Sequence, residues 1–248
     1  MPTGSFHSAR LKVERAVRHV NELQAVIATF LKTDFHRVWI DVDPQTGEHI
    51  VRYETAPAPQ PVPLIIGDAI HNLHTTLDHI ASDIAERAGL NSNRVHFPKH
   101  ETRDALEKSR EFREIVQAAP NLSAVILDEI RPYKAGNYPL WALGKLDNVD
   151  KHKLLIPTVA ITKLTGLSAI DSNYNFLSDV TVIIDAGGRM DIAGFGRPSK
   201  ITENGKPSFD ITFPKGSYFE LEPIVPTLLQ LTQLVKGVID TLEAHYFG

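Results

Sequence analysis

Residues 64–88 have the sequence LIIGDAIHNLHTTLDHIASDIAERA, and this stretch decides the fold. An α-helix turns by about 100° per residue, so apolar residues spaced three or four apart fall on one face. Such residues recur through the whole stretch, at Ile66, Ile70, Leu73, Leu77, Ile80, Ile84 and Ala88. Gly89 follows, and glycine is common just after the end of a helix. We therefore expect a long amphipathic helix whose apolar stripe packs against other helices.

Amphipathic patterns of the same kind lie on both sides of this helix. Residues 8–32 carry apolar side chains at helical spacing, and residues 223–244 predict a long C-terminal helix. Shorter helices are expected at 102–118, 122–130 and 138–152. Since each of these segments has an apolar face to bury, together they predict a helical bundle.

Two regions interrupt the helical pattern. Residues 37–42 and 49–54 are rich in β-branched and aromatic side chains, and the DPQTG between them favours a hairpin. Residues 154–214 contain the strand-like runs LLIPTVAIT, VTVIID, MDIAGF and FDITF, separated by glycine-containing turns. Because a helix comes after these runs, we expect a small antiparallel sheet inserted into the bundle, with the hairpin as a candidate member of the same sheet.

The predicted fold class is therefore α+β and mainly α. We assign residues 1–153 and 220–248 to the helical bundle, which includes the N-terminal hairpin at 37–54. Residues 154–214 are assigned to the antiparallel β-rich insertion. A chain of 248 residues can bury a sufficient core without disulfides.

The composition excludes several classes of protein. The chain has no Cys, which excludes a disulfide scaffold, a zinc ribbon and a cysteine nucleophile. Its 26 Lys and Arg residues nearly balance its 30 Asp and Glu residues, so any RNA would have to bind at a local basic patch. No apolar stretch approaches the roughly 18 residues of a membrane span, and no signal-peptide pattern opens the chain. We therefore expect a cytoplasmic protein that does not contact a membrane.

Polar side chains gather on two faces of the 64–88 helix. His71, His74 and Asp78 lie together along one border of the apolar stripe. A second set lies on another face and consists of Asp68, Asn72, Thr75 and His79. A border histidine often does no more than satisfy a buried carbonyl group. However, GDAIHNLHTTLDH holds three His and two Asp in thirteen residues, and histidine is the side chain best suited to move a proton near neutral pH.

A second candidate segment, residues 143–155, has the sequence LGKLDNVDKHKLL. On a helix, Asp147 and Asp150 lie on the same side as the leucines, which places carboxylates at or near a packed face. A buried carboxylate needs a partner. We expect Asp150 either to orient an imidazole of the 64–88 helix or to pair with a lysine or a backbone amide. His152 points away from that face and is a separate candidate, while the flanking lysines also fit an ordinary charged helix end.

The chain resembles a widespread group of uncharacterised bacterial proteins in GDAIHNLHTTLDHIA, the dipeptide Phe97-Pro98 and IRPYKAGNYPLWALGKLDNVDKHKLL. In that group the first helix has roughly the sequence LRSALDH and the later one ends in DKH. The LRSALDH pattern is similar to the active-site motif of HEPN-type helical bundles, which are commonly metal-independent endoribonucleases that act as dimers. The resemblance implies that His79 is the catalytic histidine, with Asp78 and Asn72 as neighbours. His74 stands where the motif has Arg, and a histidine stabilises a phosphorane only when it is protonated.

The leading hypothesis is a HEPN-like, metal-independent endoribonuclease, of a toxin or defence type, that binds RNA as a homodimer and needs no cofactor. Its candidate catalytic residues are His79, His74, Asp78, Asn72, Asp150 and His152. One alternative is a non-catalytic module of the same bundle class that binds RNA, a nucleotide or a protein. Another is a bundle that binds a divalent metal ion, with His71, His74 and Asp78 as ligands.

Overall fold

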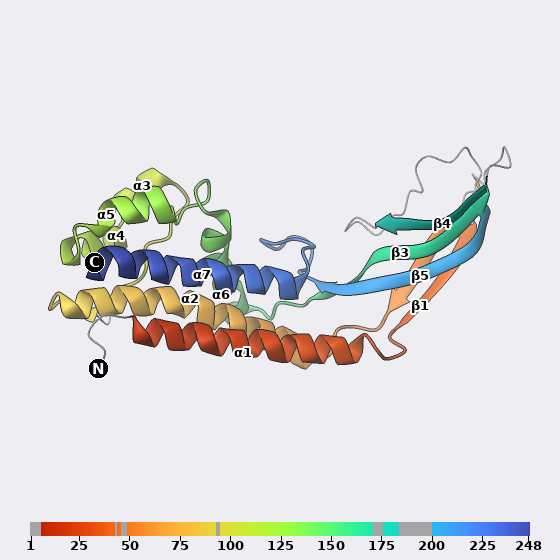
Figure 1. Cartoon of the computed structure of the whole chain (residues 1–248), viewed down its shortest axis with the longest axis horizontal. Helices are drawn as coiled ribbons and strands as arrows, with labels where there is room; N and C mark the ends of the chain where they lie inside the picture. Colours follow the sequence, from red (N-terminus) through yellow and green to blue (C-terminus); the bar gives the residue numbers. More distant parts are fainter. Residues whose placement is uncertain (1–5, 43, 46–48, 93–94, 171–175, 184–199) are drawn as a thin grey trace.

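The computed structural model describes residues 6–42, 44–45, 49–92, 95–170, 176–183 and 200–248. The molecule is α+β and mainly α, and it is elongated (Figure 1). Helices form one end of the molecule, the body, and strands form an arm that extends from it.

Three long helices form the centre of the body: α1 (His7–Phe30), α2 (Pro61–Arg87) and α7 (Ile224–Phe247). The predicted apolar stripe of α2 is confirmed from Ile66 to Ile84, where its Ile and Leu side chains are buried in the core, whereas Ala88 lies past the end of the helix and is exposed. α2 begins at Pro61, where the missing N–H of proline costs nothing because the first amides of a helix have no partner within it. All three long helices predicted from the sequence are confirmed to within a few residues.

The shorter helices are α3 (Arg103–Glu107), α4 (Arg110–Ala118), α5 (Leu122–Ala124), η2 (Val125–Ile130) and α6 (Tyr138–His152). The prediction of one helix over 102–118 is wrong. The hydroxyl of Ser109 accepts a hydrogen bond from the Phe112 amide at 3.1 Å and thereby begins a new helix. Likewise, Asn137 caps α6 by accepting from the Leu140 amide at 3.2 Å.

Among the described residues, five strands in two antiparallel sheets form the arm. The predicted hairpin is confirmed as β1 (His36–Val42) and β2 (His49–Thr55). The second sheet has the order β4-β3-β5 and consists of β3 (Thr158–Ile170), β4 (Phe176–Ile183) and β5 (Lys200–Thr212). The predicted strand MDIAGF, residues 190–195, lies outside the described residues.

The hairpin packs against the larger sheet and does not join it, so that expectation is wrong. Val38 and Tyr53 of the hairpin pack on a buried cluster formed by Ile161, Leu164, Leu167 and Ile201. This contact gives the arm a small apolar core of its own, separate from the core of the body. A two-stranded hairpin is marginal in water, and such a packed face stabilises it.

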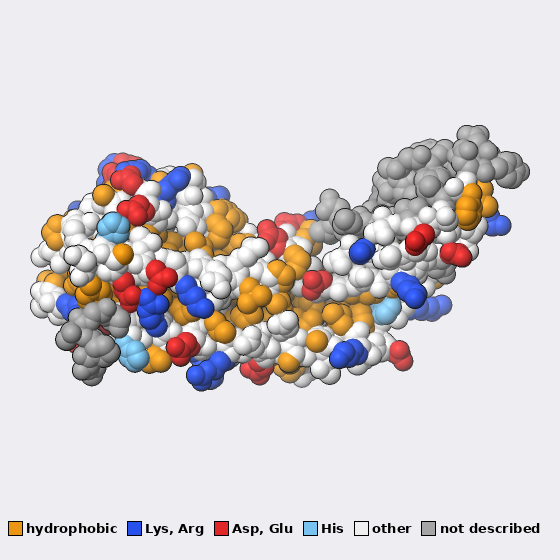
Figure 2. All heavy atoms as spheres, in the orientation of Figure 1, with side chains coloured by type: hydrophobic (Ala, Val, Ile, Leu, Met, Phe, Trp, Pro, Cys, Tyr) orange, Lys and Arg blue, Asp and Glu red, His pale blue; other side chains and the backbone are white. Residues whose placement is uncertain are grey.

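The surface view in Figure 2 shows hydrophobic side chains gathered over the middle of the molecule. None of the helices in the described part of the chain has the length and apolar character needed to cross a membrane.

α6 runs antiparallel to α2, and glycine allows the two helices to approach closely. Gly144 of α6 faces His74, and one turn or more further along, Asp150 of α6 faces Gly67. A Cβ atom built on Gly67 would lie 2.7 Å from Cγ of Asp150, which is far inside van der Waals contact. The absence of a side chain at Gly67 therefore leaves the space beside α2 that the Asp150 carboxylate occupies.

Gly67→Ala should lower the free energy of unfolding by about 1 kcal/mol, because the added methyl group would displace the Asp150 carboxylate from its place beside α2. Gly237→Ala in α7 is the matched control, since a Cβ atom there meets nothing within 4 Å. That control should raise the free energy of unfolding by about 0.5–1 kcal/mol, as expected for alanine in place of glycine in a helix. Urea denaturation measures both, and equal stabilisation by the two changes would contradict the close α2 to α6 contact.

Candidate active site

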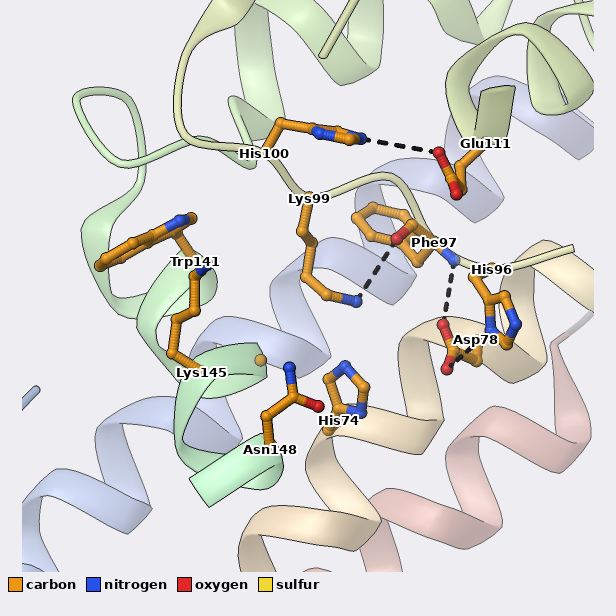
Figure 3. Close-up of a pocket in the computed structure, with 11 residues that line it drawn as sticks. His74, Asp78, His96, Phe97, Lys99, His100, Glu111, Trp141, Lys145 and Asn148 are labelled. Atoms are coloured by element: carbon orange, nitrogen blue, oxygen red, sulfur yellow. Dashed lines mark hydrogen bonds and ion pairs between the residues drawn. The ribbon is translucent and has the colours of Figure 1, made fainter. Parts of the chain in front are cut away.

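A pocket of about 280 Å³ opens in the body between α2, α6 and the segment 95–101 (Figure 3). Titratable side chains from several elements line it. α2 contributes His74 and Asp78, and the Glu111 side chain comes from α4. The segment after α2 contributes His96, Lys99 and His100, while α6 contributes Trp141, Gly144, Lys145 and Asn148.

A carboxylate behind the pocket holds the imidazole of His74. Asp147 of α6 is only 1% exposed, and its Oδ2 lies 2.9 Å from Nδ1 of His74. The other ring nitrogen, Nε2, is on the pocket side, 3.6 Å from the position that a Cβ atom on Gly144 would take. An ionised carboxylate at Nδ1 favours the ring proton there, so Nε2 keeps its lone pair for the pocket.

The charges around this pair favour a neutral imidazole beside an ionised carboxylate. Burial lowers the pKa of His74, against the opposing effect of Asp147. Burial alone would raise the pKa of Asp147, but His74 and Lys151 outweigh it and hold that pKa well below its usual range. At neutral pH, His74 is therefore suited to accept a proton at Nε2.

Asp147 also has two partners outside the pocket. Its Oδ1 lies 2.9 Å from Nδ1 of His71, and its Oδ2 lies 2.5 Å from Nζ of Lys151. The lysine is one turn further along α6, where its ammonium group reaches back to the carboxylate. Only the contact with His71 has the geometry of a hydrogen bond, while Oδ2 is paired by charge with His74 and Lys151 and has no hydrogen-bond partner among the described residues.

Two lysines bring positive charge into the pocket. Lys99 extends from its segment toward His74 (Figure 3), and its Nζ donates to the carbonyl oxygen of Phe97 at 3.4 Å. Burial lowers the pKa of Lys99, against the opposing effect of Asp78 and Asp147. Lys145 lies across the ring of Trp141, with 5.3 Å between its Nζ and the ring centroid, and forms an ion pair with Glu101 at 2.7 Å.

Asp78 ties the segment 95–101 to α2. Its Oδ1 accepts a hydrogen bond from the Phe97 amide at 3.0 Å, and its Oδ2 lies 3.4 Å from Nδ1 of His96. Burial would raise the pKa of Asp78, but Lys99 and the Phe97 amide outweigh it and lower that pKa. Further along the segment, Nε2 of His100 lies 3.6 Å from Oε2 of Glu111. Asp78 thus positions the segment that carries the pocket's other histidines and Lys99.

Of the six predicted catalytic residues, His74 and Asp78 line the pocket. His79 is not among the residues that line it. Asn72 donates its amide to the backbone oxygen of Asp68 in its own helix, at 2.7 Å. Two residues of α6 also lie elsewhere: Asp150 packs against Gly67, and His152 is exposed at the end of the helix.

The carboxylate that orients an imidazole is Asp147, whereas the sequence analysis favoured Asp150. The two lie on the same side of α6, but Asp150 is almost one turn closer to the start of α2. The helical and strand patterns of the sequence give no indication of His96, Lys99 and His100. The signal was present in VHFPKHE, residues 95–101, where two histidines and a lysine surround Phe97-Pro98.

The residues of the metal alternative do not converge on one point. His71 and His74 both contact Asp147, whereas Asp78 contacts His96 and the Phe97 amide. Across the described ranges, no group of three or more His, Asp or Glu side chains is arranged to hold a metal ion. The metal alternative stays a prediction without a ligand set in this structure.

No protein-family model, curated protein sequence or solved structure matches this chain. The resemblance to HEPN-type bundles therefore stays a prediction, and function has to be inferred from the chemistry of the pocket.

The burial of His74 makes stability depend on pH. Burial lowers the pKa of His74 in the folded state, whereas in the unfolded state that pKa is about 6.5. Below about pH 6.5 the unfolded state therefore binds more protons than the folded state, and stability is lost as the pH falls. His74→Gln should flatten the loss of melting temperature between about pH 7 and pH 5. His152→Gln removes an exposed histidine and should keep the wild-type slope. A wild-type slope in His74→Gln would show that His74 is not buried in this way.

Proposed function

We propose that this pocket cleaves RNA by acid-base catalysis without a metal ion. The observation that carries the proposal is the His74 imidazole, whose Nδ1 lies 2.9 Å from the Asp147 carboxylate while its Nε2 is on the pocket side near Lys99. A general base, a source of positive charge and further histidines in one pocket are the groups that phosphodiester cleavage requires.

In the proposed reaction, Nε2 of His74 accepts the proton of the ribose 2′-hydroxyl. The 2′-oxygen forms a bond to phosphorus, and the bond from phosphorus to the 5′-oxygen breaks. Protonated His100 gives its proton to the departing 5′-oxygen. The products are a 2′,3′-cyclic phosphate and a 5′-hydroxyl, and neither water nor a redox partner takes part in this step.

His100 is assigned the acid role because it lines the pocket and its Nε2 lies 3.6 Å from the Glu111 carboxylate. The alternative, His96, is more exposed, with 60% of its side chain accessible against 31% for His100. Lys99 and Lys145 are assigned to the phosphate, whose negative charge grows on the equatorial oxygens in the transition state.

The pocket volume supports a small reacting unit. A ligand pocket typically measures about 300–1,000 Å³, and this one is at the lower limit with about 280 Å³. It accommodates a phosphate with an adjoining sugar or base and leaves the remainder of the strand outside.

The HEPN resemblance supports the same substrate and leads to a related proposal, in which the body is a HEPN-like bundle and a homodimer presents His79 to RNA. The pocket described above belongs to a single chain, so its chemistry does not require a second subunit. The two versions differ in which histidine acts, and that difference is open to experiment.

His74→Gln should reduce cleavage of a fluorescently labelled oligoribonucleotide by about 10²–10⁴-fold, because the general base is lost. His79→Gln is the matched control on the same helix and should retain cleavage, since His79 does not line the pocket. Both are assayed with EDTA, and the product is tested for a 2′,3′-cyclic phosphate.

The reverse pattern, with loss in His79→Gln and activity in His74→Gln, would favour the HEPN motif and contradict the pocket proposal. RNA binding without any cleavage by the wild-type protein would instead support the non-catalytic binding module.

A further inference from the structure

A second groove, of about 270 Å³, lies where the body passes into the arm. The second half of α6, the connector 153–157 and the loop 214–218 form its walls. None of the residues that line it also lines the pocket of His74. The groove is therefore a separate feature, and its role is independent of the chemistry proposed for the pocket.

Large aliphatic side chains are exposed along this groove. The accessible fraction is 37% for Val149, 44% for Leu154 and 66% for Ile156, whereas Leu155 between the last two is buried. Positions that face water in a connector are usually polar, and clustered exposed aliphatic side chains mark interaction sites. The connector and the adjoining end of α6 thus leave large aliphatic side chains uncovered by the described residues.

The connector also has backbone amides that donate to no described residue. Residues 154–157 belong to neither a helix nor a strand, and the amides of Leu154 and Ile156 donate to no other described residue. An extended peptide laid along such a segment satisfies backbone donors while its side chains enter the groove, which is how one protein adds a strand to another.

The positive charge beside the groove favours a negatively charged partner. Lys153 and Lys215 line it, both are exposed, and neither forms an ion pair with a described residue. No Asp or Glu is among the described residues that line the groove. Two ammonium groups beside an apolar groove complement a ligand that has apolar side chains next to carboxylates.

We propose that this groove binds an extended segment of another protein in which large apolar side chains alternate with Asp or Glu. The apolar side chains contact Val149, Leu154 and Ile156, and the carboxylates face Lys153 and Lys215. The partner backbone lies along residues 154–156, where the amides of Leu154 and Ile156 donate to no described residue.

The test is selection of peptides from a random phage-displayed library on the full-length protein, and then fluorescence anisotropy with the enriched peptides. These peptides should combine aliphatic or aromatic residues with Asp or Glu. Ile156→Asp should weaken their binding on the order of tenfold or more, because a buried aliphatic contact is replaced by a charge. Leu11→Asp is the matched control, since Leu11 is also an exposed aliphatic residue but lies on α1, outside the groove.

Reversing the charge in Lys153→Glu with Lys215→Glu should select peptides rich in Lys or Arg instead. Melting temperatures verify that each variant is folded. The proposal is overturned by three results: no enrichment over the unselected library, enriched peptides without acidic residues, or equal binding to wild type and Ile156→Asp. Concentration-dependent self-association that Ile156→Asp abolishes would also overturn it, because the occupant would then be a second copy of the chain.

Discussion

The buried carboxylate of Asp147 is the constraint on which the rest of the pocket depends. A carboxylate with 1% exposure is stable only if its oxygens find charged or hydrogen-bonding partners. Two of those partners, His71 and His74, come from α2, and the third, Lys151, comes from α6 itself. The requirement to pair one buried charge therefore ties α6 to α2.

The same contact gives the site its chemistry. Because Asp147 occupies Nδ1 of His74, Nε2 is left toward a pocket whose other walls come from α6 and from the segment after α2. Gly144 has no side chain to fill the space beside Nε2 of His74. Asp78 fixes the segment that brings Lys99 toward the imidazole. Stability and reactivity are thus supplied by one arrangement of two helices and a connecting segment.

The sequence predicts the helices and strands of this arrangement better than it predicts which residues of neighbouring helices lie at the same level. The apolar stripe of α2 and the strand-like runs identify helices and strands, because each periodicity reports one buried face. A helical wheel shows the direction of a side chain but not its position along a neighbouring helix. For that reason Asp147 and Asp150 looked equivalent, although only Asp147 lies level with His74 and Asp150 lies level with Gly67.

The segment 95–101 was harder to predict because it has no periodicity, and Asp78 determines its position through contacts between residues far apart in sequence. The break at Ser109 was similarly hidden, because an N-cap is a local hydrogen bond that the apolar pattern of 102–118 does not reveal.

The proposed chemistry requires that Asp147 holds His74 as a neutral imidazole with its proton on Nδ1 and its lone pair on Nε2. The most direct measurement is the ¹⁵N chemical shift of the two ring nitrogens of His74 at pH 7, assigned by comparison with His74→Gln. We expect a neutral ring that carries its proton on Nδ1, and a loss of that preference in Asp147→Asn. A ring that is protonated on both nitrogens at pH 7, or one that carries its proton on Nε2, would contradict this assignment.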